Sequence, residues 1–225
     1  GDKTASKPLN RATDTTRQPG STFKILAAYS AALDAGGLTL ASVQDDAPYT
    51  YAGANGKSVN NYDRRYRGFT TLREAITDSI NIVTVKTLAQ AGVSLGWQYV
   101  QEYGFTTVDS RDMNEALALG GITQGVSNLE LTAAYAAIAN QGTYIRPKFY
   151  TKILDHDGNV LIDNTTPESH TVIKDTTAWL LTSAMEDVMT SGTGTSAYFG
   201  SSMAQAGKSG TTTLNRDALF AGFTP

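Results

Sequence analysis

The chain contains no cysteine and only two histidines among its 225 residues. Without cysteine there can be no disulfide, thiolate nucleophile or cysteine-ligated metal, and cysteine usage does not indicate a compartment. His156 and His170 are too few and too isolated for a histidine metal cluster. His156 also precedes Asp157-Gly158, a dipeptide typical of a hairpin tip. A Ser-His-Asp triad therefore has no candidate histidine, and we expect neither a metal nor another cofactor.

Strong charge and long apolar runs are also scarce. The net charge is -3, only 17% of residues are charged, and the one basic cluster, 64–67, is short and reads as a solvated loop. We therefore expect no nucleic-acid partner. No apolar run is long enough to span a bilayer, and the sequence starts at Gly1 without a cleavable leader. We expect any targeting element or membrane anchor to lie outside these residues.

What the sequence does contain is a proline–glycine turn that leads straight into an apolar helical pattern. From Phe23 onward, apolar residues recur at helical spacing, which predicts a largely buried helix over 21–35, opened by Ser21. Lys24 follows Ser21 by three residues, so their side chains are expected to meet on one face of the helix start. In such a contact Ser21 is a potential nucleophile and Lys24 is a potential base for it.

The chemistry of such a pair depends on the protonation state of the lysine. A serine hydroxyl attacks a carbonyl only when a neighbour accepts its proton. Burial, the positive end of the helix dipole and any second cation would each lower the pKa of Lys24. The amide of Ser21 could donate to an oxyanion. Alone, the motif more often describes a capping serine followed by a solvated lysine.

A second polar pair interrupts a later helical pattern. That pattern begins at Thr71, where Glu74 completes a capping box. In a continuous helix Ser79 and Asn81 would point to different faces, so a shared site requires the backbone to turn between them. We expect Asp78 or Ser79 to cap a second helix that starts near residue 80.

A third candidate segment lies near the end of the chain. Residues 206–213 predict a strand that pairs with a return strand over 218–223 near a sheet edge. The polar and small residues in its middle are Lys208, Ser209, Gly210 and Thr211. Ser209 and Thr211 share a face of such a strand, and glycine lets another backbone approach closely. We expect a carboxylate or a peptide strand to dock there.

The remaining pattern predicts further helices, one hairpin and irregular connections. The expected elements are helices over 94–103, 129–140 (opened by a Ser127–Glu130 capping box) and 176–189 (capped by Asp175), a hairpin formed by 144–154 and 159–163, an irregular excursion over 38–70, and a glycine-rich connection over 120–126 with a structural role near the cleft.

Taken in order, Ser21-x-x-Lys24, Ser79-x-Asn81 and Lys208-Ser209-Gly210 resemble the motif set of penicillin-binding proteins and serine β-lactamases. The flanking residues resemble the transpeptidase domain of a bifunctional, class A penicillin-binding protein, over nearly the whole chain. The third motif has serine where threonine is usual, which keeps the hydroxyl.

The resemblance implies an α+β fold of the β-lactamase/transpeptidase type, with an antiparallel sheet flanked by helices. It implies one domain, 1–225, with a helical subregion at about 70–142. The family has further strands at both ends, so we expect an incomplete sheet. Either another chain segment completes it, or these residues are a shortened form of the domain whose activity is left open. A preceding glycosyltransferase domain and a membrane anchor are left open.

The resemblance also implies a reaction. Ser21 would attack the penultimate D-alanine carbonyl of a peptidoglycan stem peptide, and the acyl group would pass to an amine on a neighbouring strand. Lys24 would be the acylation base, Ser79 the proton shuttle, and Asn81 the residue that holds the substrate amide. Lys208 would keep Ser79 polarised.

Substrate binding and location follow from the same resemblance. Ser209 and Thr211, flanking Gly210, would bind the substrate carboxylate, and the amides of Ser21 and Thr211 would form the oxyanion hole. β-Lactam antibiotics would acylate Ser21. The expected location is the extracytoplasmic, cell-wall-facing side of the bacterial membrane, with membrane contact only through regions before Gly1.

Two other functions remain open. A class A β-lactamase would carry Glu-x-x-Leu-Asn to activate water, but Glu115 and Glu130 do not sit in that pattern, and the sequence around Glu130 reads as a helix cap. We therefore expect slow hydrolysis of the acyl-enzyme. The second alternative is a non-catalytic β-lactam sensor or scaffold domain.

Overall fold

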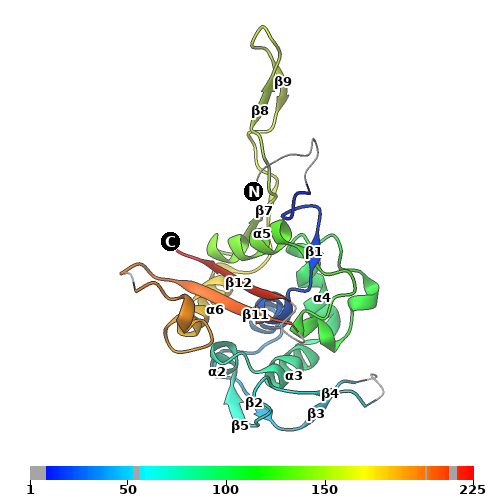
Figure 1. The fold of residues 1–225 in the computed structure, drawn as a ribbon, viewed down its shortest axis with the longest axis vertical. Helices are drawn as coiled ribbons and strands as arrows, with labels where there is room; N and C mark the ends of the chain where they lie inside the picture. Colours follow the sequence, from blue (N-terminus) through cyan, green and yellow to red (C-terminus); the bar gives the residue numbers. More distant parts are fainter. Residues whose placement is uncertain (1–8, 53–55, 201, 213–216) are drawn as a thin grey trace.

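A two-stranded antiparallel sheet lies across the middle of the computed structural model, which describes residues 9–52, 56–200, 202–212 and 217–225 (Figure 1). Strands β11 (Ala206–Thr211) and β12 (Ala218–Phe223) pair over their full length, from Ala206 opposite Phe223 to Thr211 opposite Ala218. Helix α6 (Asp175–Thr190) contacts β11, and α5 (Asn128–Ala139) contacts β12. Within the described residues this sheet contains only these two strands.

Short helices and paired strands surround this sheet. The other α-helices are α1 (Ser30–Asp34), α2 (Leu72–Thr77), α3 (Asn81–Ala91) and α4 (Val93–Glu102), and 3-10 turns η3, η4 and η5 cover Ser110–Asp112, Glu115–Leu119 and Thr195–Ala197. The small antiparallel pairs are β1 (Thr16–Arg17) with β6 (Val126–Ser127), β2 (Val43–Asp46) with β5 (Gly68–Thr71), β3 (Tyr49–Thr50) with β4 (Ser58–Val59), β7 (Thr143–Ile145) with β10 (Ser169–Thr171), and β8 (Lys152–Leu154) with β9 (Val160–Asp163).

The segment expected to be one helix over 21–35 is built from three helix types. A 3-10 turn η1 (Gly20–Thr22) leads into a π-helix η2 (Lys24–Tyr29), which continues as α1. All side chains from Thr22 to Ala32 are buried, and apart from Thr22, Lys24 and Ser30 they are hydrophobic, as expected for a helix without a solvent-facing side. Helices α3 and α4 pack against it. The predicted burial is correct, but uniform helical geometry is not.

The predicted helix caps are confirmed at the two complete capping boxes, and the other predicted caps are wrong. The Thr71–Glu74 and Ser127–Glu130 boxes both form with reciprocal hydrogen bonds. Helix α6 instead has Lys174 at its N-cap, and Asp175 is its first helical residue. A lone aspartate lacks the second partner that fixes the position of a box, so its place relative to the cap is ambiguous by one residue.

The start of α3 also differs from expectation. Its N-cap is Ile80, which has no side-chain acceptor, and neither Asp78 nor Ser79 caps the helix. Ser79 takes a left-handed conformation with φ of 56°, which turns its hydroxyl away from the helix end. The chain does break between α2 and α3, as the polar interruption predicted.

Two strand predictions need adjustment. The hairpin around Asp157-Gly158 includes only β8 and β9, because residues 143–145 pair with β10 instead. Pro147 lies between the two pairings, where its missing N–H does not interrupt a ladder. Strand β11 ends at Thr211, and Thr213 lies outside the described residues.

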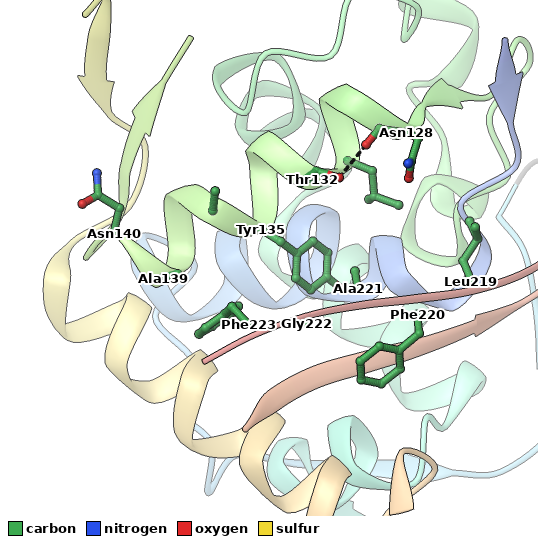
Figure 2. A pocket seen from close by; sticks show the side chains of 12 residues that line it. Asn128, Thr132, Tyr135, Ala139, Asn140, Leu219, Phe220, Ala221, Gly222 and Phe223 are labelled. Atoms are coloured by element: carbon green, nitrogen blue, oxygen red, sulfur yellow. Dashed lines mark hydrogen bonds between the residues drawn. The ribbon is translucent and has the colours of Figure 1, made fainter. Parts of the chain in front are cut away.

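Two surface features lie away from the motif segments. The β8–β9 hairpin projects beyond the body of the molecule, at the top of Figure 1. A groove of about 410 Å³ separates α5 from β12, with Leu219 and Phe223 of the strand on one side and Tyr135 of the helix on the other (Figure 2).

Within the described residues, none of the helices has the length and apolar character needed to cross a membrane.

Candidate active site

The three motif segments, far apart in the sequence, meet around the hydroxyl of Ser79. Lys24 Nζ donates to Ser79 O at 2.6 Å and lies 3.1 Å from Ser79 Oγ. Lys208 Nζ donates to the same Oγ at 2.8 Å. One serine hydroxyl therefore lies between two lysine amines, one from the central helix and one from β11.

Asn81 completes the set of acceptors around Lys24. Its Oδ1 accepts from Lys24 Nζ at 2.7 Å, and its Nδ2 donates to Asn60 O at 2.7 Å. Ser79 and Asn81 can face the same amine because the left-handed bend at Ser79 ends α2 before α3 begins. The expected turn between these two residues is thus present, and it directs both of them toward Lys24.

Ser21 lies beside this cluster and opens onto solvent. It is half-buried and lines a cleft of about 710 Å³ together with Asn81 and Thr211. Lys24 follows this 3-10 turn as the first residue of the π-helix.

The expected contact between Ser21 and Lys24 is not a hydrogen bond in this structure. Among the described residues, the side-chain hydrogen bonds of Lys24 all go to Ser79 and Asn81. The amine is fully buried and must satisfy its polar hydrogens, and these two residues provide the acceptors. The Ser21 hydroxyl is left facing the cleft.

Both lysines of the cluster are fully buried, and their pKa values are correspondingly low. Burial lowers the pKa of Lys24 well below its ordinary range, and the neighbouring cation Lys208 lowers it further. Burial lowers the pKa of Lys208 to about 7. A neutral Lys24 can donate to Ser79 O and Asn81 Oδ1 and still keep a lone pair for a proton. Both amines therefore give up a proton more readily than a lysine in water does.

Glycines bring the Ser21 turn against β11 and the glycine-rich connection. Gly20 has a φ of +55°, and a Cβ on it would lie 3.2 Å from Thr211 O and 3.5 Å from Thr211 N. A Cβ on Gly210 would lie 2.8 Å from Pro19 O, and one on Gly120 only 2.6 Å from Gly20 O. Side chains larger than hydrogen would push these backbones apart.

The glycine-rich connection is held to the segment before Ser21. Ile122 N donates to Gln18 Oε1 at 3.1 Å, the Gln18 amide donates back to Ile122 O, and β1 pairs with β6 just beyond. Gly120 and Gly121 line the cleft. The connection forms one wall of the cleft, which is the structural role its composition suggested.

The expected substrate-binding residues of β11 occupy different surroundings. Thr211 is exposed and lines the cleft beside Ser21. The Ser209 hydroxyl pairs with the Thr193 hydroxyl at 2.8 Å. Gly210 packs against the backbone of the Ser21 turn, so it gives room to that turn. The pattern analysis missed Thr193, which lies in a Ser/Gly/Thr loop with no distinguishing motif.

Neither glutamate considered for water activation is free to do so. Glu130 bonds within its capping box and also accepts from Thr106, while Glu115 accepts from Tyr49 OH and Ala52 N, each at 2.9 Å. Within the part of the chain that the structure describes, the residues lining the cleft include no glutamate, and no group of three histidines, aspartates or glutamates is placed to hold a metal ion.

Comparison with known sequences extends over the whole chain. The family described as penicillin binding protein transpeptidase domain matches residues 2–225. Penicillin-binding protein 1F of Bacillus subtilis is 39% identical over 98% of this chain and 30% of its own length. Penicillin-binding protein 1A of Neisseria flavescens is 37% identical over 98% of this chain and 28% of its own. The chain thus spans less than a third of the curated relatives it matches.

Solved structures show the same fold. Penicillin-binding protein 1A from Haemophilus influenzae superposes with a TM-score of 0.83 at 28% identity, covering 96% of this chain and 37% of that one. The penicillin-binding protein PonA1 from Mycobacterium tuberculosis gives 0.83 at 25% identity, covering 100% and 60%. These neighbours have the α+β, β-lactamase-like fold expected from the motifs, and the fold assignment is therefore confirmed.

Proposed function

The chain belongs to the penicillin-binding protein transpeptidase domain family, and from this premise we propose that it is a D,D-transpeptidase acting through a Ser21 acyl-enzyme. The single observation that supports this most is the Ser79 hydroxyl held between two buried amines, next to a cleft that Ser21 lines. The proposed donor is a peptidoglycan stem peptide ending in D-Ala-D-Ala, and the proposed inhibitors are β-lactams.

In the first step Ser21 Oγ attacks the carbonyl carbon of the penultimate D-alanine. Lys24 takes the hydroxyl proton in its neutral form, which burial and the nearby Lys208 cation favour by lowering its pKa. The backbone amides of Ser21 and Thr211 donate to the developing oxyanion. The proximity of Thr211 N to Gly20 supports this pairing of amides.

In the second step the C–N bond to the terminal D-alanine breaks. Ser79 Oγ gives its proton to the leaving nitrogen and recovers one from the amines that contact it, Lys24 and Lys208. Asn81 holds the substrate amide. An amine of a neighbouring strand then attacks the ester, and the same groups carry its proton in the reverse direction.

Substrate orientation is assigned to the outer face of β11. Thr211 and Ser209 bind the substrate carboxylate, with Thr211 in the cleft and Ser209 held by Thr193. We further propose that residues 1–225 act as one catalytic domain on the extracytoplasmic side of the bacterial membrane, and that another chain segment pairs with β12 to complete the sheet.

A fluorescent penicillin tests the function directly. The parent protein is expected to form a covalent adduct on Ser21, detectable on a denaturing gel and by mass spectrometry of the labelled peptide, and Ser21→Ala is expected to form none. Labelling that persists in Ser21→Ala would overturn the assignment of the nucleophile.

The fate of the adduct separates the competing functions. A transpeptidase is expected to keep it for far longer than one β-lactamase turnover, because no glutamate among the described residues lines the cleft. Rapid loss of the adduct would indicate a β-lactamase. Stable labelling without any turnover of a thioester or peptide donor would indicate a sensor or scaffold.

A further inference from the structure

The amide of Asn61 holds the start of helix α3, a function that its own N-cap residue cannot perform. Asn61 is buried, and its Oδ1 accepts from Asn81 N at 3.0 Å and from Ile82 N at 3.2 Å. A helix leaves its first N–H groups without partners inside the helix. Ile80 at the N-cap offers no oxygen, so Asn61, from the connection after β4, caps the helix from outside.

Asp46 sets the orientation of that amide. Asn61 Nδ2 donates to both carboxylate oxygens of Asp46, at 2.8 and 3.0 Å, and to Arg65 O at 2.8 Å. A carboxylate only accepts hydrogen bonds and the helix N–H groups only donate, so the amide has one orientation that satisfies both sides. Asp46 is fully buried at the end of β2 and also accepts from Arg67 N at 2.9 Å.

The residue held in this way is a member of the catalytic cluster. The N–H of Asn81 is fixed by Asn61, its Nδ2 donates to the carbonyl of Asn60, and its Oδ1 accepts from Lys24. The two consecutive asparagines 60 and 61 therefore hold Asn81 at both its backbone and its side chain. The left-handed bend at Ser79 lies two residues earlier, so its direction depends on where Asn81 is anchored.

We propose that Asn61, oriented by Asp46, is a positioning residue for acylation. By holding Asn81 it sets the bend at Ser79 and the acceptors that surround Lys24. This inference rests on the proposed acylation of Ser21. It assigns a function to a loop that carries none of the three motifs.

An exchange of the two side chains tests the proposal on the full chain. Asn61→Asp keeps the shape but places a second carboxylate against Asp46 in a buried site. The maximal acylation rate constant with a fluorescent penicillin is expected to fall about tenfold or more, with little change in the half-saturating concentration. Asp46→Asn combined with Asn61→Asp restores one carboxylate and one amide but leaves Arg65 O without its donor, so it is expected to recover only part of the lost rate.

Asp34→Asn is the matched control for a lost structural contact. Asp34 accepts from Tyr99 OH at 2.7 Å and Lys174 N at 2.8 Å, away from the cluster. This variant is expected to unfold at a lower temperature while its acylation rate constant stays unchanged. If Asn61 had only a structural function, Asn61→Asp would likewise lose stability and keep the parental acylation rate constant. That result would overturn the proposal.

Two further measurements keep the test decisive. If Asn61→Asp does not fold, Asp46→Asn alone is measured. The proposal would also be overturned if that variant acylates at the parental rate and its Asn81 and Ile82 amides are protected from hydrogen exchange as in the parent. If the parent forms no adduct, the proposed function fails independently. Hydrogen exchange at those two amides then tests the anchoring, with unchanged protection in Asn61→Asp contradicting it.

Discussion

At the scale of single residues, the site depends on two buried amines that share one hydroxyl. Lys24 and Lys208 both contact Ser79 Oγ, and burial lowers both pKa values. Their removal from water destabilises the fold at neutral pH, and it also makes a lysine able to accept a proton there.

Replacing Lys208 by methionine is expected to stabilise the protein at neutral pH while impairing acylation. The pKa of Lys208 is about 7 when folded and 10.5 ordinarily, so unfolding takes up a proton between these values. The contribution of Lys208 to the unfolding free energy therefore rises as the pH increases from about 7 to 10.5, and it is least favourable near pH 7. Lys208→Met should gain about 2 kcal/mol in unfolding free energy at pH 7, after the loss of its hydrogen bonds.

Denaturant unfolding at several pH values measures this effect. The advantage of Lys208→Met should shrink as pH approaches 10.5, because the unfolded parent then also loses its proton. A variant that is less stable than the parent at pH 7 would show that the hydrogen bonds of Lys208 outweigh its desolvation.

The same substitution is expected to shift the pH dependence of acylation. Lys208 lowers the pKa of Lys24 by its charge, so removing it raises that pKa. The acid limb of the residual acylation rate should therefore move to higher pH. Lys152→Met removes the same charge from the exposed hairpin and should leave the limb in place. An unmoved limb in Lys208→Met would mean that another group limits the rate.

At the scale of elements, the active-site turn is set by close backbone contacts between segments. The 3-10 turn η1 is contacted by β11 and lies against the glycine-rich connection. From the other side, Tyr135 OH of α5 donates to Thr22 O at 2.7 Å. Ser21 is therefore presented to the cleft by three separate elements.

Gly120→Ala is expected to displace that turn. Gly120 has a φ of +72°, and its new Cβ would lie 2.6 Å from Gly20 O and 2.7 Å from Gly20 N. Gly158→Ala is the matched control, since its φ is +85° but no atom lies within 4 Å of its Cβ. Gly120→Ala should lose about 2 kcal/mol more unfolding free energy than the control.

Acylation should distinguish the two glycine variants as well. Gly158→Ala should label with penicillin at the parental rate, and Gly120→Ala should label more slowly because Ser21 follows the displaced Gly20. Equal losses of stability in the two variants would show that backbone strain alone, and not the contact with Gly20, decides the effect.

At the scale of the whole molecule, the motif segments and the projecting hairpin are separate. Every side chain of strands β8 and β9 is exposed, and the hairpin extends away from the sheet in Figure 1. At its base Asn164 N donates to Thr151 O at 2.7 Å, so the two ends already lie close enough for a tight turn. We therefore expect the fold of the remainder not to depend on these strands.

Replacing residues 152–163 by an Asn-Gly turn is therefore expected to leave the domain intact. Unfolding free energy should change by less than about 0.5 kcal/mol, since the deleted strands are exposed. The penicillin acylation rate should be unchanged. A large fall in either quantity would show that the hairpin contacts another part of the protein. Thermal unfolding and gel labelling of parent and variant measure both.

The sequence by itself determined the family, the fold class and the buried central helix. It also determined the elements whose signals are local: the two capping boxes and the break between α2 and α3. These depend on residues a few positions apart, whose hydrogen bonds and apolar spacing can be read along the chain. The three motifs also named Lys24, Ser79, Asn81 and Lys208, the residues that the structure brings together around the Ser79 hydroxyl.

Only the tertiary structure decided how those motifs meet. The π-helix after Ser21, the left-handed bend at Ser79 and the hydrogen bonding of Lys24 to Ser79 and Asn81 all arise from packing between distant segments. The capping of α3 by Asn61 is of the same kind, because Asn61 and Asn81 are twenty residues apart in the sequence. Buried polar groups form hydrogen bonds with whichever partner the fold brings near, and the spacing of residues along the sequence does not identify that partner.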